Sequence, residues 1–320
     1  MNKKMRTTDN TLTGLRKWLT AGAVAALTAT GAHAADAQSC KTVRMGVMSW
    51  TDVQATSGIA QVLLQDMGYN VKQVTASQQI LMSGLKDGRS LDIFLGYWQP
   101  LMDPVVKPYL DAGSAKMLPE PSLTDARTSL AVPTYTYEKG LKTFDDIAKF
   151  KKEVGAKIYG IEPGVESNNK ITQMIETDKF GLKDFSLVEA GEMGIMATLK
   201  RAVSREEDMV FFGWTPHPMN VNFDISFLSG SDDVFAEDDG KAVVSTITSP
   251  AFPEQCPNVY SLLENLKFNA TEVSELMIQI IDRVPPETAA RDWLDAHPER
   301  RSAWLKGVTH FDGSPLTSSE

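Results

Sequence analysis

The sequence predicts an α/β protein of two lobes, joined by two crossover segments, with a ligand cleft between the lobes. Short apolar runs alternate with amphipathic helical patterns, which is typical of a parallel sheet covered by helices. Two extended runs, 129–133 and 241–249, are expected to connect the lobes. The length favours two cores, because about 286 of the 320 residues follow residue 34.

The first lobe is expected to consist of residues 35–128 together with 239–308. Its first part alternates between the two patterns, with a glycine after each of the first two helices. The expected strands are 43–48, 70–74 and 91–95, and the expected helices are 56–67, 78–85 and 104–110. After the return crossover, helices are expected at 256–266, at 271–284 and around Trp293.

The second lobe is expected to span residues 129–238. Its apolar periodicity predicts helices at 143–150, 168–177 and 193–201, and strands at 157–161 and 209–212. The polar residues 309–320 are expected to form a frayed tail.

Residues 1–34 have the features of a cleavable signal peptide. Five basic residues, Lys3, Lys4, Arg6, Arg16 and Lys17, flank or precede a short Ala-rich apolar stretch, and Ala32-His33-Ala34 fits an A-x-A cleavage signal. No later segment is long and apolar enough to span a bilayer. An exported protein is therefore predicted. Residues 37–39 are a poor match to the apolar lead-in of a lipid-anchored cysteine at Cys40.

The charge and the cysteines restrict the possible partners and the compartment. The net charge is −9, and residues 1–34 are themselves basic, so a nucleic-acid partner is not expected. The two cysteines, Cys40 and Cys256, predict one disulfide in an oxidising compartment, with two free buried thiols as the alternative.

Three tryptophans, Trp50, Trp98 and Trp214, end apolar runs that each contain a glycine. Three strands are predicted to deliver these indoles to the sheet edge where open α/β sheets bind ligands. Converging indole faces suit a quaternary ammonium group, although burial in the core is the alternative for any single tryptophan. The glycines are expected to let the backbone approach a ligand or its own turn closely. Trp293 and Trp304 lie in helical patterns and are assigned to packing.

Asp52 leaves two interpretations open. It can cap a helix that begins near Thr56, or its carboxylate can face a cation or accept a hydrogen bond from a ligand hydroxyl. His217 has no second His or Cys at metal-ligand spacing, so no metal site is predicted. Glu162 follows a strand without an identifiable partner carboxylate. Motifs of nucleophilic, phosphate-binding or metal-dependent enzymes do not occur, so neither catalytic residues nor cofactors are predicted.

Several segments together resemble the periplasmic choline-binding proteins of ABC importers, within the wider glycine betaine and proline-betaine binding group. These segments are S-W-T-D (49–52), D-I-F-L-G-Y-W (92–98), Y-G-I-E-P-G (159–164), F-F-G-W-T-P-H-P-M-N (211–220), S-G-S-D-D-V-F (229–235) and E-Q-C-P-N-V (254–259). The resemblance runs from Cys40 to about Trp304. It implies a bilobed periplasmic-binding-protein fold, a periplasmic location, no enzymatic activity, and delivery of a captured ligand to an inner-membrane permease.

The resemblance also implies roles for individual residues. Trp50, Trp98 and Trp214 match aromatic residues of the ligand box, Asp52 matches a carboxylate that meets the ligand, and the two cysteines match a family disulfide. The implied ligand is choline. Glycine betaine and carnitine are alternatives in the same role, and an exported choline-ester hydrolase is a distant one.

Two expected ligand positions depart from the family pattern. Thr128 stands where the choline binders carry a tyrosine, and Val165 stands where they carry an asparagine after Glu-Pro-Gly. Tyr97 is a candidate for replacing the missing aromatic surface, although neighbouring strand residues point to opposite faces. The class of ligand is therefore predicted from the three tryptophans, and its identity depends on these departing positions.

Overall fold

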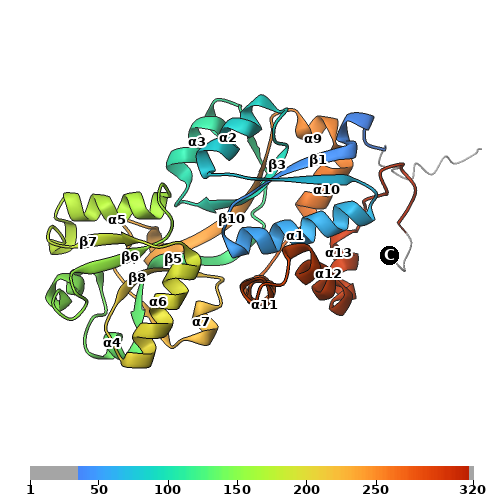
Figure 1. The fold of residues 1–320 in the computed structure, drawn as a ribbon. Coiled ribbons are helices and arrows are strands. Elements are labelled where there is room, and N and C mark those ends of the chain that lie inside the picture. Colours follow the sequence, from blue (N-terminus) through green and yellow to red (C-terminus); the bar gives the residue numbers. More distant parts are fainter. Residues whose placement is uncertain (1–34, 317–320) are drawn as a thin grey trace, which may run out of the picture. The chain divides into compact units, whose positions relative to one another are not determined.

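The computed structural model describes residues 35–316, whose strands form one mixed sheet with helices on both sides (Figure 1). The strand order is β2-β1-β3-β10-β5-β8-β6-β7, with β4 paired to β10 and β9 paired to β5. The predicted signal peptide, 1–34, lies outside the described residues. The bilobed α/β architecture that the sequence predicts is confirmed by this arrangement.

The first lobe begins with the predicted alternation of strands and helices. Its strands are β1 (Thr42–Val47), β2 (Asn70–Thr75), β3 (Ile93–Gln99) and β4 (Lys116–Met117), and its first helices are α1 (Thr51–Asp66), α2 (Gln78–Asp87) and α3 (Asp103–Asp111). β1 is parallel to both β2 and β3. The helix expected from Thr56 begins at Thr51, so Asp52 lies inside its first turn.

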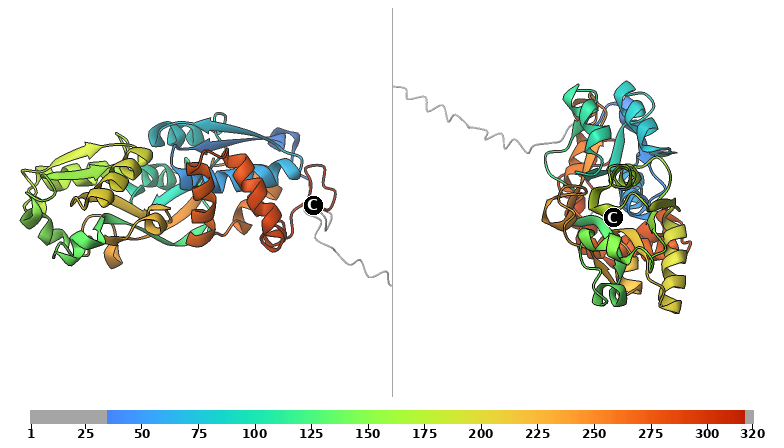
Figure 2. Two further views of the ribbon diagram at one scale, coloured as in Figure 1. Left: turned by 60° about the horizontal axis from the view of Figure 1, so that its bottom comes forward. Right: turned by 90° about the vertical axis from the view of Figure 1, so that its left-hand side faces the viewer.

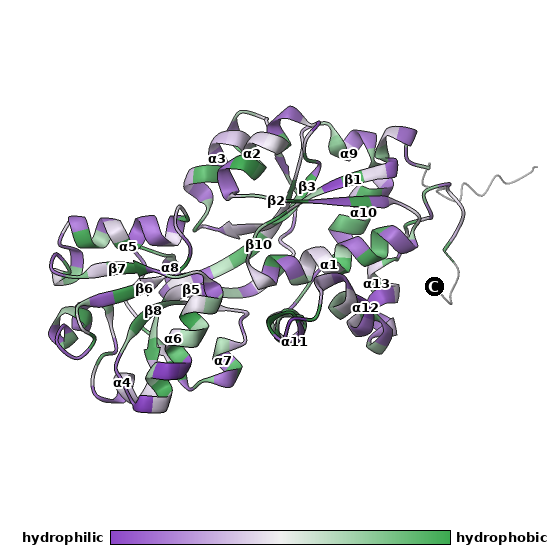
Figure 3. Cartoon of the chain, in the orientation of Figure 1, coloured by the Kyte–Doolittle hydropathy of each residue, from purple (hydrophilic) through white to green (hydrophobic). Residues whose placement is uncertain are grey.

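The last helices return to the first lobe after the second crossover. They are α9 (Phe252–Gln255), α10 (Pro257–Asn265), α11 (Ala270–Ile281), α12 (Pro286–Ala296) and α13 (Pro298–Trp304). α1 is buried along most of its length because it packs against α11 and α12 as well as the sheet. Hydrophobic residues of α11 face this packing, whereas α12 carries many hydrophilic residues (Figure 3). Within 35–316, no helix is long and apolar enough to cross a membrane.

The second lobe is built around the parallel strands β6 (Lys157–Gly160), β7 (Ser186–Glu189) and β8 (Val210–Thr215), with β9 (Ile225–Phe227) beside the crossover. Its α-helices are α4 (Thr134–Glu138), α5 (Glu166–Glu176), α6 (Glu192–Arg205), α7 (Met219–Asn222) and α8 (Glu237–Gly240). α5 covers one side of these strands and α6 covers the other (Figure 1). Within residues 35–316, three segments are 3-10 helices, namely Gln38–Lys41, Phe144–Phe150 and Lys179–Gly181. The helix expected at 143–150 is therefore of this tighter type.

Both predicted crossovers are strands of the sheet, β5 (Leu123–Pro133) and β10 (Lys241–Thr248). β5 pairs with β10 up to Arg127 and with β8 from Arg127 onward, antiparallel in both cases. The sheet therefore continues from one lobe to the other and is mixed rather than wholly parallel. Figure 2 shows β5 and β10 running together between the lobes. This change of partner supports the proposed boundary after Thr128.

A disulfide and several hydrogen bonds hold the two ends of the described chain to the first lobe. Cys40 and Cys256 are bonded, with their Cα atoms 5.7 Å apart, so the pairing predicted from the sequence is confirmed. The Thr309 backbone N–H donates to Asn258 at 2.9 Å, and the Phe311 ring packs edge-on against Tyr69. Residues 309–316 therefore do not fray as expected, whereas 317–320 lie outside the described part.

Candidate functional site

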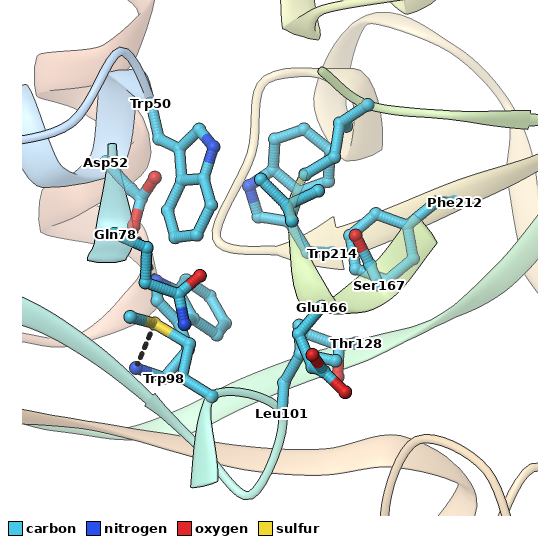
Figure 4. A pocket seen from close by; sticks show the side chains of 13 residues that line it. Trp50, Asp52, Gln78, Trp98, Leu101, Thr128, Glu166, Ser167, Phe212 and Trp214 are labelled. Atoms are coloured by element: carbon cyan, nitrogen blue, oxygen red, sulfur yellow. Dashed lines mark hydrogen bonds between the residues drawn. The ribbon is translucent and has the colours of Figure 1, made fainter. Parts of the chain in front are cut away.

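A pocket lies between the two lobes, and all six predicted ligand positions line it (Figure 4). These residues are Trp50, Asp52, Trp98, Thr128, Val165 and Trp214. They come from the start of α1, from β3, β5 and β8, and from the turn that precedes α5. Folding thus brings together residues that are far apart in the sequence, and their role in binding remains a prediction.

Trp98 forms one wall of the pocket from within β3, close to the carboxyl end of the strand. Its indole Nε1–H donates to Oδ2 of Asp52 at 2.9 Å. Both side chains are buried, so the bond satisfies the polar edge of the indole and fixes the orientation of the ring. The peptide bond between Gln99 and Pro100, which follows the tryptophan, is cis.

Trp50 forms a second wall from the loop between β1 and α1, immediately before the helix. Its indole Nε1–H donates to the carboxylate of Glu162, which belongs to the second lobe. Ser49 approaches the same carboxylate at 3.4 Å. The orientation of this first-lobe indole therefore depends on a residue across the cleft. Glu162 follows a strand without an obvious partner in the sequence, but in the structure it holds the Trp50 ring in place.

Trp214 faces Trp50 from the second lobe (Figure 4). It stacks with Phe212, whose ring centroid is 5.8 Å away at an interplanar angle of 28°. The His217 ring packs edge-on against the indole, with the centroids 4.4 Å apart. Asn220 donates to the backbone oxygens of Trp214 and His217 and so holds the loop after β8. Neighbours on two sides thus fix this indole.

His217 is a packing residue in the described structure. Its Nδ1 accepts the Met219 backbone N–H at 2.9 Å, and its Nε2 lies 2.8 Å from Oε1 of Glu192. Both ring nitrogens are therefore occupied by hydrogen bonds within the protein. No group of His, Cys, Asp and Glu residues suited to hold a metal ion occurs within residues 35–316.

Glu192, at the start of α6, is a functional neighbour that the sequence analysis missed. It is buried, and it accepts hydrogen bonds from the backbone N–H of Thr51 at 3.0 Å and from the Thr51 hydroxyl. Thr51 is the first residue of α1, so a carboxylate of the second lobe satisfies a free N–H at the start of a first-lobe helix. These hydrogen bonds connect the two lobes beside the pocket.

Asp52 does not cap α1, because its carboxylate bonds to Trp98 and the position that would cap the helix is occupied by Trp50. Burial first, and then the negative charge of Glu192, raise the pKa of Asp52 to about 7, although the hydrogen bond from Trp98 opposes the shift. A cation in the pocket would favour the ionised form. The second of the two sequence interpretations, a carboxylate directed at the ligand site, is the one compatible with this geometry.

Phe212 is a further aromatic residue of the pocket lining that the sequence analysis did not name. It lines the pocket and lies two residues before Trp214 on β8, so strand alternation places both rings on one face. This signal was present in the sequence and was missed. The suggestion that Tyr97 replaces the wall is wrong, because Tyr97 is outside the pocket lining and its hydroxyl donates to Asp103 at 2.7 Å.

The glycines that precede Trp98 and Trp214 allow neighbouring elements to pack closely. They do not serve to bring the backbone close to a ligand. A Cβ at Gly96 would lie 2.6 Å from a methyl carbon of Val53 in α1. A Cβ at Gly213 would lie 3.1 Å from Ala131 and from Phe227. The expectation that these glycines face the ligand or a turn is therefore wrong at both positions, because they allow close contact between β3 and α1 and between β8 and its neighbours.

The charged residues that line the described pocket are both acidic, Asp52 and Glu166. Three further polar side chains in the lining are Gln78, Thr128 and Ser167, and only Thr128 was predicted. Gln78 and Ser167 occupy the first turns of α2 and α5, respectively. Aromatic faces, carboxylates and neutral polar groups together give a pocket suited to a small organic cation with a polar tail.

The chain matches a known protein family over most of its length. Residues 41–296 match OpuAC, the substrate binding domain of ABC-type glycine betaine transport system. An uncharacterized protein, ORF1, from Chromohalobacter salexigens is 34% identical over 132 residues, which are 41% of this chain and 84% of that protein. A glycine betaine/carnitine transport binding protein, GbuC, from Listeria monocytogenes is 29% identical over 173 residues, so the match spans 52% of this chain and 56% of the Listeria protein.

Solved structures give matches over more of the chain. An ABC-transporter choline binding protein in complex with choline has a TM-score of 0.83 and 40% identity, and the match covers 88% of this chain and 96% of that one. Lactococcal OpuAC, complexed with glycine betaine, has a TM-score of 0.74 at 22% identity over 83% of this chain and 99% of that one, which supports the fold. The chain belongs to the OpuAC family and is a substrate-binding protein of an ABC transporter.

Proposed function

We propose that this protein captures a trimethylammonium compound, with choline as the first candidate, and delivers it to a permease in the inner membrane. The observation that carries this proposal is the convergence of Trp50, Trp98, Trp214 and Phe212 on one pocket. Aromatic faces attract cations, and each contact contributes roughly 0.5–2 kcal/mol once water is excluded. Choline in a solved structure at 40% identity supports the same ligand class.

The charges of the pocket favour choline over zwitterionic ligands. Asp52 and Glu166 line it, and within the described lining they are not accompanied by Lys or Arg. A ligand carboxylate would face these acids without a cationic partner, whereas a quaternary ammonium would be stabilised by them. Glycine betaine and carnitine are the alternatives, in keeping with the printed name of the Listeria relative.

We infer binding rather than catalysis from the hydrogen bonds around the pocket. The Thr51 hydroxyl donates to Glu192, and both nitrogens of His217 are occupied by Glu192 and Met219. A hydroxyl paired with a free base, as an ester hydrolase requires, does not occur among these residues. The proposed setting is the periplasm, reached after cleavage of residues 1–34, where an oxidising environment supports the disulfide.

Isothermal titration calorimetry with choline and glycine betaine on the wild type and Trp214→Ala tests the proposal. Loss of one desolvated indole face is expected to weaken choline binding by about tenfold or more. Trp293→Ala is the matched control, because Trp293 is also buried but lies in α12, outside the pocket lining. Equal affinity of wild type and Trp214→Ala, or no quaternary amine bound by the wild type, would contradict the proposal.

A further inference from the structure

Three polar side chains that line the pocket have no hydrogen-bond partner in the described part of the chain. They are Gln78, Thr128 and Ser167, each at most 2% exposed. Both the amide nitrogen and the amide oxygen of Gln78 lack a partner, as do the two hydroxyl oxygens. A buried polar atom without a partner costs about 1–3 kcal/mol, so these groups require an explanation.

The three side chains come from different elements of the fold but line the same pocket. Gln78 begins α2 in the first lobe, Thr128 lies on β5 where the chain passes between the lobes, and Ser167 is in the first turn of α5 in the second lobe. Figure 4 shows Gln78 on the side of Trp98 and Ser167 on the opposite side, near Phe212. Side chains from separate elements thus direct four unpaired polar atoms to one pocket.

We propose that Gln78, Thr128 and Ser167 form a neutral subsite that binds the hydroxyl tail of the trimethylammonium ligand. This inference rests on the proposed function and assigns the polar end of the same pocket. A hydroxyl donates one hydrogen bond and accepts two, and the Gln78 carboxamide offers both an acceptor and donors.

The unpaired atoms favour a hydroxyl over a carboxylate. A carboxylate only accepts hydrogen bonds, so it would leave the amide oxygen of Gln78 without a partner. It would also lie in a pocket whose charged lining residues are Asp52 and Glu166. A ligand hydroxyl donates to that oxygen and accepts from the serine or threonine hydroxyl, so it satisfies both kinds of group without adding negative charge.

A comparison of choline with propyltrimethylammonium, in which a methyl group replaces the hydroxyl, isolates the subsite. Calorimetry is performed on the wild type, Gln78→Met and Ser167→Ala. The wild type is expected to prefer choline by about tenfold or more, because the analogue leaves the polar groups unpaired. Gln78→Met is expected to reduce this preference to about threefold or less, because the variant no longer has the amide group that distinguishes a hydroxyl from a methyl group.

The matched controls are Gln173→Met in α5 and Ser83→Ala in α2, which remove the same groups from exposed positions outside this pocket lining. Both are expected to keep the full preference for choline. Binding of propyltrimethylammonium by each variant shows that its pocket is folded.

Three other outcomes would contradict the proposed function, the subsite or its ligand group, respectively. If the wild type binds neither amine, the proposed function fails. If it binds both but Gln78→Met and Ser167→Ala keep the wild-type preference, the subsite assignment alone is overturned. If glycine betaine binds more tightly than choline and Gln78→Met weakens only glycine betaine, the subsite takes a carboxylate and the hydroxyl assignment is wrong.

Discussion

The indole N–H of Trp98 donates to Oδ2 of Asp52 at 2.9 Å, and this bond joins an aromatic wall of the pocket to its buried carboxylate. The same carboxyl group has a pKa raised to about 7, first by burial and then by the charge of Glu192. A bound cation would stabilise the ionised form and lower that pKa. Ligand binding and loss of a proton from Asp52 are therefore linked.

Choline affinity is expected to increase as the pH rises from about 5.5 to 7 and to level off above that range. Below its pKa, Asp52 must lose a proton when the cation binds, which weakens binding by up to about tenfold per pH unit. Calorimetry across this range measures the slope, and Asp52→Asn is expected to remove it. The same slope in Asp52→Asn would assign the titration to another group.

The Glu192→Gln variant is expected to move the midpoint of this pH profile to lower pH. Glu192 is buried beside Asp52, and its negative charge raises the pKa of Asp52, so neutralising it makes ionisation easier. The glutamine retains an oxygen that can accept from Thr51. Glu207→Gln, at an exposed position beyond α6, is the control and is expected to leave the profile unchanged. A midpoint that stays in place in Glu192→Gln would contradict this coupling.

The positions of the main aromatic residues could be predicted from the sequence because strand periodicity is local. Trp98 and Trp214 lie in strands that the apolar runs identify, and the open edge of an α/β sheet brings such strand ends together. The same rule applied to β8 would have found Phe212, and it correctly places Tyr97 on the face opposite Trp98. The positions of these residues can be predicted without knowing how the two lobes are arranged.

Contacts across the cleft could not be predicted in the same way. Glu162 and Glu192 bond to residues of the first lobe that lie more than a hundred positions away, and no local pattern specifies such partners. Gln78 and Ser167 begin helices, where polar residues are common for reasons of local capping. Only the relative placement of the lobes shows that these side chains have no partner and face the pocket.

Phe212→Leu is expected to weaken choline binding severalfold, because it removes an aromatic face that lines the pocket and stacks on Trp214. The adjacent Phe211→Leu is the control. Phe211 is also fully buried but lies outside the pocket lining, so this change is expected to lower stability while keeping the affinity of the folded protein. Calorimetry and thermal unfolding of both variants distinguish a lost ligand contact from a general packing defect. Equal affinities in the two variants would exclude Phe212 from the ligand box.

Replacement of both Cys40 and Cys256 by alanine is expected to destabilise the protein by about 2–5 kcal/mol without a change in choline affinity. The bridge closes a loop between residues that are 216 positions apart, and a constraint of this length reduces the entropy of the unfolded chain by an amount worth at most about 5 kcal/mol. Neither cysteine lines the pocket. Urea unfolding of the variant and the oxidised wild type measures the loss, and calorimetry measures the affinity. A variant as stable as the wild type would show that the packing of α10 and the hydrogen bonds of Asn258 already hold this end of the first lobe in place.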